Sequence, residues 1–354
     1  MSRFFSKKYE ALVPYVPGEQ PQDKSYIKLN TNESPFPASP KAQALVQEAA
    51  TRLQLYSDPL CTRLTKKAAQ RYGVSTDRVI FTNGSDEVLN FAIMAFCDSD
   101  TPAVFPDITY GFYSVFADLN AVPYEKIPLG EDFSINVADY IGCNKTVIIA
   151  NPNAPTGLSL PLEQVEQIVK SNPNNVVIID EAYVDFGGES AVPLTEKYDN
   201  LLVVQTFSKS RSMAGARLGM AFGSPGLIND LRTMQFSTNP YNVNAMTMAA
   251  GLGALEDEEY FKENCGKIVD NRAWTTQALA KLGFTTIPSK TNFILTKTAA
   301  IGGKELYLEL KAQGILVRHF DTDRLRDFVR VTIGKREEMQ TFVATVKQIL
   351  EEKV

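Results

Sequence analysis

Lys209 follows an apolar run that is typical of a β-strand and lies in a loop rich in hydroxyl groups. Its amine could form a Schiff base with an aldehyde cofactor, although a solvated surface loop is the alternative interpretation. The hydroxyls of Thr206 and Ser208 precede it, and the guanidinium of Arg217 comes shortly after it. Because hydroxyl and guanidinium groups bind phosphate, the segment points to a phosphorylated cofactor.

A second candidate is Asp180, which ends the apolar run at residues 177–179. A carboxylate at the carboxyl end of a buried strand lies where α/β sheets bind their ligands. It could keep the nitrogen of a pyridine ring protonated, whereas a helix N-cap is its alternative role. Tyr183 comes shortly after and could contact the phenolic oxygen of such a ring, or could simply be a packed aromatic.

Two further loops follow predicted strands and carry groups that a ligand could use. The backbone N–H groups of Ser85 and Asp86 begin a helix and form an anion site that the helix dipole strengthens. The loop at residues 151–157 places Asn153 where a ring hydroxyl could be met. An ordinary capped turn and an ordinary Asn/Pro loop are the alternatives, so each loop alone is weak evidence.

The elements that must position these residues alternate between short apolar runs and helical stretches. The runs lie at residues 79–82, 103–105, 146–150, 176–180, 201–204 and 219–222. Several are apolar without alternation, which predicts strands covered on both faces in a mainly parallel sheet of a layered α/β domain. After about residue 244 the helix and strand mixture is typical of a smaller α+β domain. We expect a large domain at residues 30–243 and a small domain from residues 1–29 and 244–354.

Composition narrows the class of function. The net charge of −5 comes from 36 basic and 41 acidic residues spread along the chain, which argues against nucleic-acid binding. No apolar stretch approaches the roughly 20 residues that span a bilayer, and the start lacks a secretory signal. Four separated cysteines and one histidine, His319, predict no metal site. We therefore expect a cytoplasmic protein without a membrane partner.

The order of these motifs along the chain is more specific than any one of them. The chain carries, in this order, an anion-binding turn, an aromatic residue, an Asn loop, an Asp at the end of a strand, a Ser-Lys pair and an Arg. This order is very similar to that of the fold-type I aminotransferases, which depend on pyridoxal 5'-phosphate (PLP). Within that group the chain most resembles the histidinol-phosphate aminotransferases. The resemblance covers nearly the whole chain and includes residues 29–35, 56–59, 109–113, 240–244 and 329–334. It implies a large domain with a mainly parallel seven-stranded sheet and a small α+β domain.

The resemblance also implies roles for single residues. Lys209 would be the Schiff-base lysine, Asp180 the partner of the ring nitrogen, Tyr110 the residue stacked on the ring, and Tyr183 a contact of the ring oxygen. The cofactor phosphate would be bound by Ser85, Asp86, Thr206, Ser208 and Arg217.

Other implied roles concern the substrate and a second subunit. Arg330 resembles the arginine that binds the carboxylate of the amino acid in the reverse half-reaction, and Arg318, on the preceding strand, is a further candidate anion contact. Asn32, in the resembling stretch at residues 29–35, is also assigned to the substrate site. Tyr56 would reach the cofactor phosphate of a neighbouring subunit, which implies a homodimer. Core aromatics and surface arginines are the alternative interpretations of these side chains.

One position departs from the family pattern. Many relatives carry Asn directly before Pro-Thr-Gly, where this chain has Ala154. The contact to the ring oxygen would then be weaker, absent, or supplied by Asn153, and we expect Asn153 to supply it.

The implied reaction converts histidinol phosphate and 2-oxoglutarate reversibly into imidazole acetol phosphate and glutamate in histidine biosynthesis, so the partners would be a small amino donor and a 2-oxo acid. Aromatic amino acid aminotransferases and a threonine-phosphate decarboxylase share most of the same residues and are the alternatives. A ligand-sensing regulator would need an added DNA-binding segment, for which the short N-terminus offers no room.

Overall fold

A computed structural model describes residues 2–353, and its larger unit is built on a seven-stranded sheet in the order β2-β8-β7-β6-β5-β3-β4. The strands are β2 (Val79–Thr82), β3 (Ala103–Pro106), β4 (Tyr124–Ile127), β5 (Thr146–Ala150), β6 (Val177–Asp180), β7 (Leu201–Thr206) and β8 (Gly219–Phe222). Neighbouring strands are parallel except that β8 runs antiparallel to β2 and β7. The predicted mainly parallel seven-stranded sheet is confirmed.

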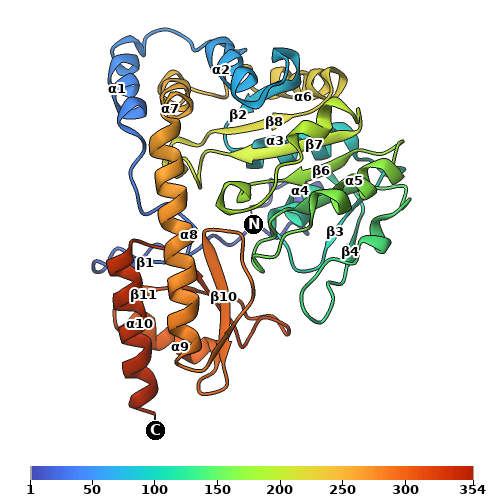
Figure 1. The fold of residues 1–354 in the computed structure, drawn as a ribbon. Coiled ribbons are helices and arrows are strands. Elements are labelled where there is room, and N and C mark those ends of the chain that lie inside the picture. Colours follow the sequence, from blue (N-terminus) through green and yellow to red (C-terminus); the bar gives the residue numbers. More distant parts are fainter. Residues whose placement is uncertain (1, 354) are drawn as a thin grey trace.

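Both faces of the central strands are buried, as their continuous apolar sequences predict. Ile149 and Ile179 face one core and Ile148 and Ile178 face the other, because successive side chains of a strand point to opposite faces. Helices α2, α5 and α7 contribute to the first core, and α3, α4 and α6 to the second, so the sheet lies between two helical layers (Figure 1). The helices are α1 (Pro40–Ala49), α2 (Thr62–Tyr72), α3 (Ser85–Phe96), α4 (Phe112–Asn120), α5 (Leu162–Ser171), α6 (Pro225–Thr238) and α7 (Ala245–Glu256).

The smaller unit combines two sheets from opposite ends of the chain. A four-stranded antiparallel sheet has the order β12-β13-β10-β9, and β1 pairs in parallel with β11. The strands are β1 (Ile27–Lys28), β9 (Phe284–Thr286), β10 (Phe293–Thr298), β11 (Ile315–Leu316), β12 (Arg318–His319) and β13 (Val329–Thr332). Its helices are α8 (Glu258–Ala280), α9 (Gly303–Ala312) and α10 (Arg336–Glu351).

Helix α8 has 23 residues and runs alongside both units, from the end of α7 down to the smaller sheet (Figure 1). Helix α7 buries Ala250 and Leu255 in the core of the seven-stranded sheet and packs against α1 and α2. The boundary expected between residues 243 and 244 stays a prediction, and this packing favours a division after α7.

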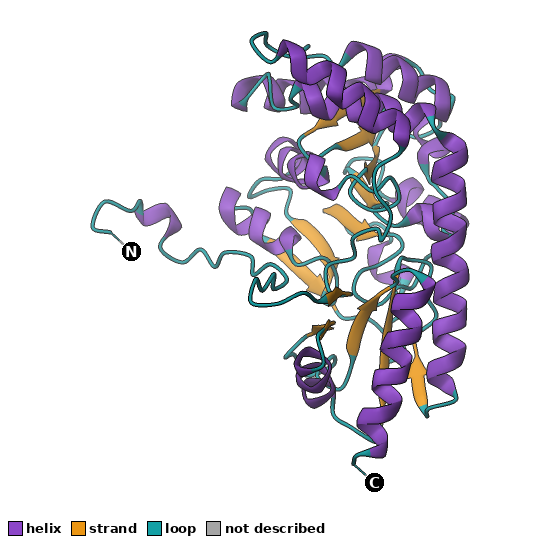
Figure 2. Cartoon of the chain, turned by 90° about the vertical axis from the view of Figure 1, so that its left-hand side faces the viewer, coloured by secondary structure: helices purple, strands orange, loops and turns teal. Residues whose placement is uncertain are grey.

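The first residues of the chain extend away from both units (Figure 2). Phe4 is 81 % exposed in this arm, whereas the chain joins the smaller unit through β1. Within residues 2–353, no helix combines the length and the apolar character needed to cross a membrane.

Gly219 begins β8 where that strand passes the turn before α3. A Cβ atom at this position would overlap the backbone of the turn, at the Ser85 amide nitrogen and the Gly84 carbonyl group. Only glycine therefore lets β8 approach the turn that carries Ser85.

Gly219→Ala is expected to destabilise the protein by about 1–3 kcal/mol, because the turn and the strand must move apart in a packed region. The measurement is the free energy of unfolding from urea denaturation. Gly215→Ala is the matched control, since a Cβ atom there would meet nothing within 4 Å. Equal stability of the two variants would contradict the close approach that we describe.

Candidate active site

Two adjoining cavities lie where the seven-stranded sheet meets the smaller unit. The inner cavity has about 130 Å³ and the outer cavity about 640 Å³. Tyr110, Ala154, Tyr183 and Lys209 line both of them, so these four residues form the boundary between the cavities. The inner cavity is lined only by residues of the larger unit, whereas Arg318 and Arg330 of the smaller unit line the outer one.

The sheet brings distant residues into the inner cavity. Asp180 ends β6 and Thr206 ends β7, and these parallel strands finish at the same edge of the sheet. Ser85 begins α3 just after β2 and lines the same cavity. The structure therefore brings together three residues that are predicted from separate motifs, at the position where α/β sheets bind ligands.

Asp180 is 4 % exposed, and both oxygens of its carboxylate accept hydrogen bonds. Tyr113 donates through Oη to Oδ2 over 2.8 Å, and the Ala182 amide donates to Oδ1 over 3.1 Å. Burial raises the pKa of Asp180 to about 6, while both hydrogen bonds and the Lys209 charge oppose that rise. The carboxylate is therefore ionised at neutral pH.

Lys209 lies in the loop after β7, where its side chain reaches both cavities. Its Nζ atom is 5.6 Å from the centre of the Tyr183 ring. An amine at this boundary can contact a group in the inner cavity and a second molecule in the outer one. That placement suits a lysine that holds a cofactor and then moves a proton.

Donors suited to a phosphate group gather at one end of the inner cavity. Arg217 donates to the Ser208 hydroxyl over 3.3 Å and forms an ion pair with Asp86 at 3.1 Å. Gly84 makes this possible because a Cβ atom there would lie 2.5 Å from the Arg217 guanidinium. With the N-terminus of α3 at Ser85, these groups match the chemistry of a phosphate-binding site.

Tyr110 forms a wall of the inner cavity and is fixed at two points. Its hydroxyl donates to Asp86 Oδ1 over 2.8 Å, and its ring meets the Tyr113 ring edge-on at 5.7 Å. Asp86 therefore orients both Tyr110 and Arg217 with its two carboxylate oxygens.

The expectation for Asn153 does not agree with its orientation. Its side chain is 3 % exposed and turned toward the loop after β3, where Oδ1 accepts from Thr109 and Nδ2 donates to the Ile108 carbonyl, and Nδ2 also donates to Thr156 of its own loop. The methyl group of Ala154 faces the cavities instead. The structure thus does not bring the Asn153 amide into the site, because neighbouring loop groups use all of its polar atoms.

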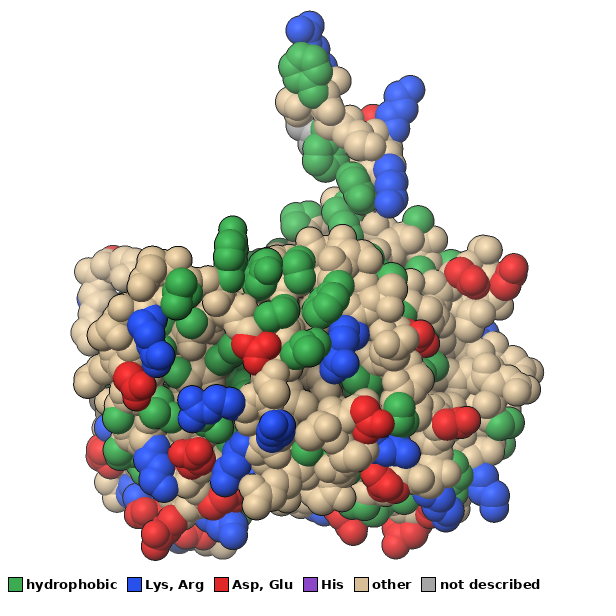
Figure 3. Space-filling model, turned by 90° about the horizontal axis from the view of Figure 1, so that it is seen from above, with side chains coloured by type: hydrophobic (Ala, Val, Ile, Leu, Met, Phe, Trp, Pro, Cys, Tyr) green, Lys and Arg blue, Asp and Glu red, His purple; other side chains and the backbone are tan. Residues whose placement is uncertain are grey.

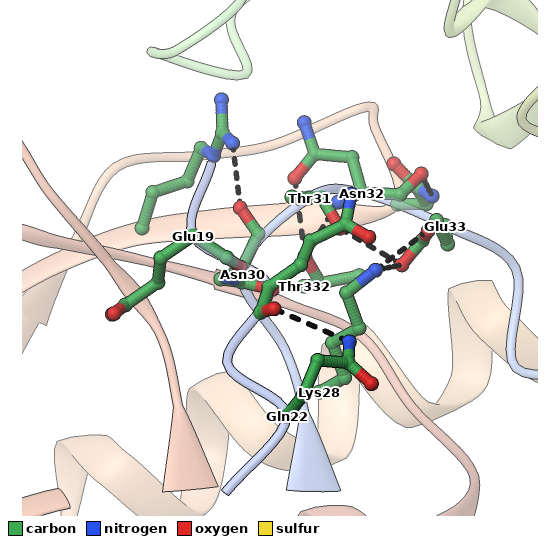
Figure 4. Close-up of polar contacts among 11 residues, drawn as sticks. Glu19, Gln22, Lys28, Asn30, Thr31, Asn32, Glu33 and Thr332 are labelled. Atoms are coloured by element: carbon green, nitrogen blue, oxygen red, sulfur yellow. Dashed lines mark hydrogen bonds and ion pairs between the residues drawn. The ribbon is translucent and has the colours of Figure 1, made fainter. Parts of the chain in front are cut away.

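Tyr183 remains as a hydrogen-bond donor beside Ala154. Asn32 donates through Nδ2 to Tyr183 Oη over 2.9 Å. Thr332 in turn donates to Asn32 Oδ1 over 3.1 Å, and Figure 4 shows these two residues side by side. Since Tyr183 Oη accepts from Asn32, its own proton is free to be donated elsewhere. The structure places Asn32 at the outer cavity, as predicted for a site residue, and also behind Tyr183.

The outer cavity contains a half-buried cation, Arg330, that has no carboxylate partner among the residues that the structure describes. The guanidinium of Arg330 donates to the Asn30 carbonyl over 3.0 Å, and its Nε atom has no hydrogen-bond partner among residues 2–353. Arg318 lies opposite Arg330 in the β12–β13 register, and Arg324 lines the same cavity. Because an unpaired buried charge is costly, this arrangement favours an anionic ligand.

Two residues of the site were not expected from the sequence. Tyr15 lines the outer cavity and stacks on Phe112 at 4.2 Å, but its extended N-terminal segment carries no local signal. Tyr113 carries only the weak signal of a second tyrosine near Tyr110.

Tyr56, which is predicted to reach the site of a neighbouring subunit, lines neither cavity of its own chain. Its side chain is 85 % exposed and stacks on Tyr241.

A second buried carboxylate, Glu181, lies behind Asp180. It accepts hydrogen bonds from the Ser190 hydroxyl, the Ala191 amide and the Gln205 amide, at 2.6, 2.6 and 2.8 Å. Burial raises the pKa of Glu181 to about 7, and these hydrogen bonds only partly oppose the rise.

The substitution Glu181→Gln is expected to change how stability depends on pH. The folded protein holds the Glu181 proton more tightly than the unfolded chain, so its contribution to stability is lost as pH rises from about 4.5 to about 7. The difference in unfolding free energy, wild type minus variant, should therefore fall across that window, by at most about 1.4 kcal/mol per pH unit. Urea denaturation at several pH values measures it, and a difference independent of pH would contradict the assignment.

Comparison with known proteins agrees with this geometry. The model of the family described as aminotransferase class I and II matches residues 24–346. A histidinol-phosphate aminotransferase of Brachyspira hyodysenteriae is 49% identical over 99% of both chains, and one of Clostridium botulinum is 45% identical over 99% of both chains. The crystal structure of a histidinol-phosphate aminotransferase from Sinorhizobium meliloti, in complex with pyridoxal-5'-phosphate, has a TM-score of 0.91 at 22% identity and covers 100% of this chain and 99% of that chain. The chain belongs to the class I and II aminotransferases, and within them to the family of the histidinol-phosphate aminotransferases.

Proposed function

We propose that this aminotransferase uses PLP to transfer an amino group from histidinol phosphate to 2-oxoglutarate. The observation that carries the proposal is the convergence of Lys209, Asp180 and Arg217 on one inner cavity, which adjoins an outer cavity lined by the half-buried Arg330. Full-length relatives named histidinol-phosphate aminotransferase, at 45% and 49% identity, support the choice of amino donor.

The residues of the inner cavity fit PLP group by group. The phosphate site at Ser85, Ser208 and Arg217 would hold its phosphate, and Asp180 would face its ring nitrogen. Tyr110 would stack on the ring, and Tyr183 would donate to the ring oxygen in place of the amide that Ala154 lacks. When bound, PLP supplies a protonated ring that withdraws electrons from the substrate Cα.

The protein's own groups would then act on the substrate. Lys209 Nζ lies at the boundary of the cavities and would take the proton from the substrate Cα as a general base. Asp180, ionised at neutral pH, would hold the proton on the ring nitrogen. Arg330 would bind the anionic group of the substrate and so orient its Cα toward Lys209.

The two substrates present different anions to the same outer cavity. Histidinol phosphate carries a phosphate, whereas 2-oxoglutarate carries two carboxylates. Arg330, Arg318 and Arg324 supply three guanidinium groups there, which match either kind of anion. Asn32 would contribute to substrate binding mainly by holding Tyr183.

We also propose that the enzyme is a homodimer in which Tyr56 reaches the phosphate site of the neighbouring subunit. Tyr56, Leu53 and Leu55 are 85%, 58% and 63% exposed, and Tyr241 stacks on Tyr56 at 4.6 Å. Hydrophobic side chains gather on the face seen from above in Figure 3. An exposed apolar area of this kind is typical of a protein interface.

We also propose a cytoplasmic location. The four cysteines are free and three of them are buried, which is usual in a reducing compartment and supports the proposal.

The first test is a substrate panel on the protein incubated with PLP. The wild type should gain absorbance near the visible edge that shifts with histidinol phosphate and changes little with phenylalanine. Lys209→Ala should lose that absorbance and the activity, because it removes the only amine proposed to bind the cofactor covalently. Release of carbon dioxide from threonine phosphate would instead identify a decarboxylase, and a protein that takes up no PLP would refute the proposal.

Arg330→Gln should lower kcat/KM for histidinol phosphate and for glutamate by about 100-fold or more, since a buried charged contact is lost. It should change the stability of the substrate-free protein little, because the half-buried guanidinium gives up one hydrogen bond to a carbonyl and no carboxylate partner among residues 2–353. Steady-state kinetics and thermal unfolding measure the two effects. Arg336→Gln is the control, since Arg336 also has an unpartnered buried nitrogen but packs on Trp274 outside both cavities. Unchanged kinetics in Arg330→Gln would exclude the proposed contact.

A further inference from the structure

Tyr113 lies directly behind the inner cavity, near the start of α4. Its side chain is 0 % exposed and does not line the cavity itself, but it contacts Tyr110 and Asp180, which do. It packs edge-on against Phe105 of β3 at 5.8 Å, which fixes the plane of its ring.

Two of its contacts lead to residues with proposed roles at the cofactor. The Tyr113 hydroxyl donates to Asp180 Oδ2 over 2.8 Å, and the ring meets Tyr110 at 5.7 Å with an interplanar angle of 85°. Tyr113 therefore contacts both Asp180, which is proposed to face the ring nitrogen, and Tyr110, which is proposed to stack on the ring.

We propose that Tyr113 is a positioning residue for the reaction, whose hydroxyl keeps the Asp180 carboxylate oriented and ionised while its ring supports Tyr110. The inference rests on the proposed function, because Asp180 and Tyr110 take their roles from PLP. Tyr113 itself contacts neither the substrate cavity nor the reacting atoms.

The electrostatics of Asp180 support this role. Burial raises its pKa, and the Tyr113 hydrogen bond is the strongest of the opposing influences, followed by the Ala182 amide. The charged groups that face Asp180 are Asp86, which raises the pKa, and Lys209, which lowers it. Removal of the hydroxyl therefore shifts the pKa of Asp180 further upward.

The test compares Tyr113→Phe with Tyr140→Phe. Both tyrosines are buried, but the Tyr140 hydroxyl has no hydrogen-bond partner among the described residues, so its loss removes no contact. Tyr113→Phe keeps the ring beside Tyr110 and deletes only the hydroxyl.

In the PLP-loaded enzyme, Tyr113→Phe should lower kcat about tenfold, because a hydrogen bond to a charged group is lost. The acid limb of its kcat profile should move to higher pH, while KM for histidinol phosphate stays within about twofold of wild type. Tyr140→Phe should leave both parameters and the profile unchanged. A folded Tyr113→Phe variant with the wild-type kcat and pH profile would overturn the proposal.

A measurement without cofactor separates this inference from the proposed function. As pH rises through about 6, the stability lost on ionising Asp180 should be greater in Tyr113→Phe, so the wild-type-minus-variant difference should grow. A difference independent of pH would show that the hydroxyl does not act on Asp180, whether or not the wild type takes up PLP. If Tyr113→Phe alone does not fold, the double variant with Asp180→Asn should fold, since no carboxylate then lacks its donor. Failure of both to fold would assign Tyr113 a packing role only.

Discussion

The site depends on one buried carboxylate that stays charged. Asp180 ends a central strand with almost no contact with solvent, where an isolated carboxylate would take up a proton. Two hydrogen bonds and a nearby ammonium group oppose that tendency enough to keep its pKa near 6. Three elements contribute to this one charge. Strand β6 positions the carboxylate, α4 carries the Tyr113 donor, and the loop after β7 carries the Lys209 ammonium group. The same edge of the sheet carries Ser85 and Ser208, which belong to the proposed phosphate site, so one edge of the sheet positions both the carboxylate and the groups proposed to bind the phosphate.

Much of the fold follows from local sequence. Strands such as β5 and β6 are continuous apolar runs, because helices cover both of their faces, and such runs are easily recognised. The edge strand β4 was missed, since Glu125 and Lys126 are exposed and give the segment the appearance of a loop. The domain boundary placed before α7 stays a prediction, because an apolar helix does not reveal from its sequence which core it joins; in the structure α7 packs in the core of the large sheet.

Only part of the candidate site could be predicted from the sequence. Lys209, Asp180 and Arg217 stand in motifs whose order along the chain identifies the family, so their convergence could be expected. The direction of a side chain within a loop could not be predicted, so Asn153 was expected at the cavity, although its amide binds groups of the loop after β3 and of its own loop. Tyr113 was missed for the same reason, since a hydroxyl that points inward looks like any other core aromatic.

The parallel pairing of β1 with β11 has a consequence for how the enzyme is made. All seven strands of the large sheet lie within residues 79–222, whereas Ile27 must wait for Ile315 before it has a partner. During synthesis the ribosome therefore releases the complete inner cavity long before the arginines of the outer one. A nascent chain halted between these two stages would contain every residue of the inner cavity but none of the three arginines of the outer cavity.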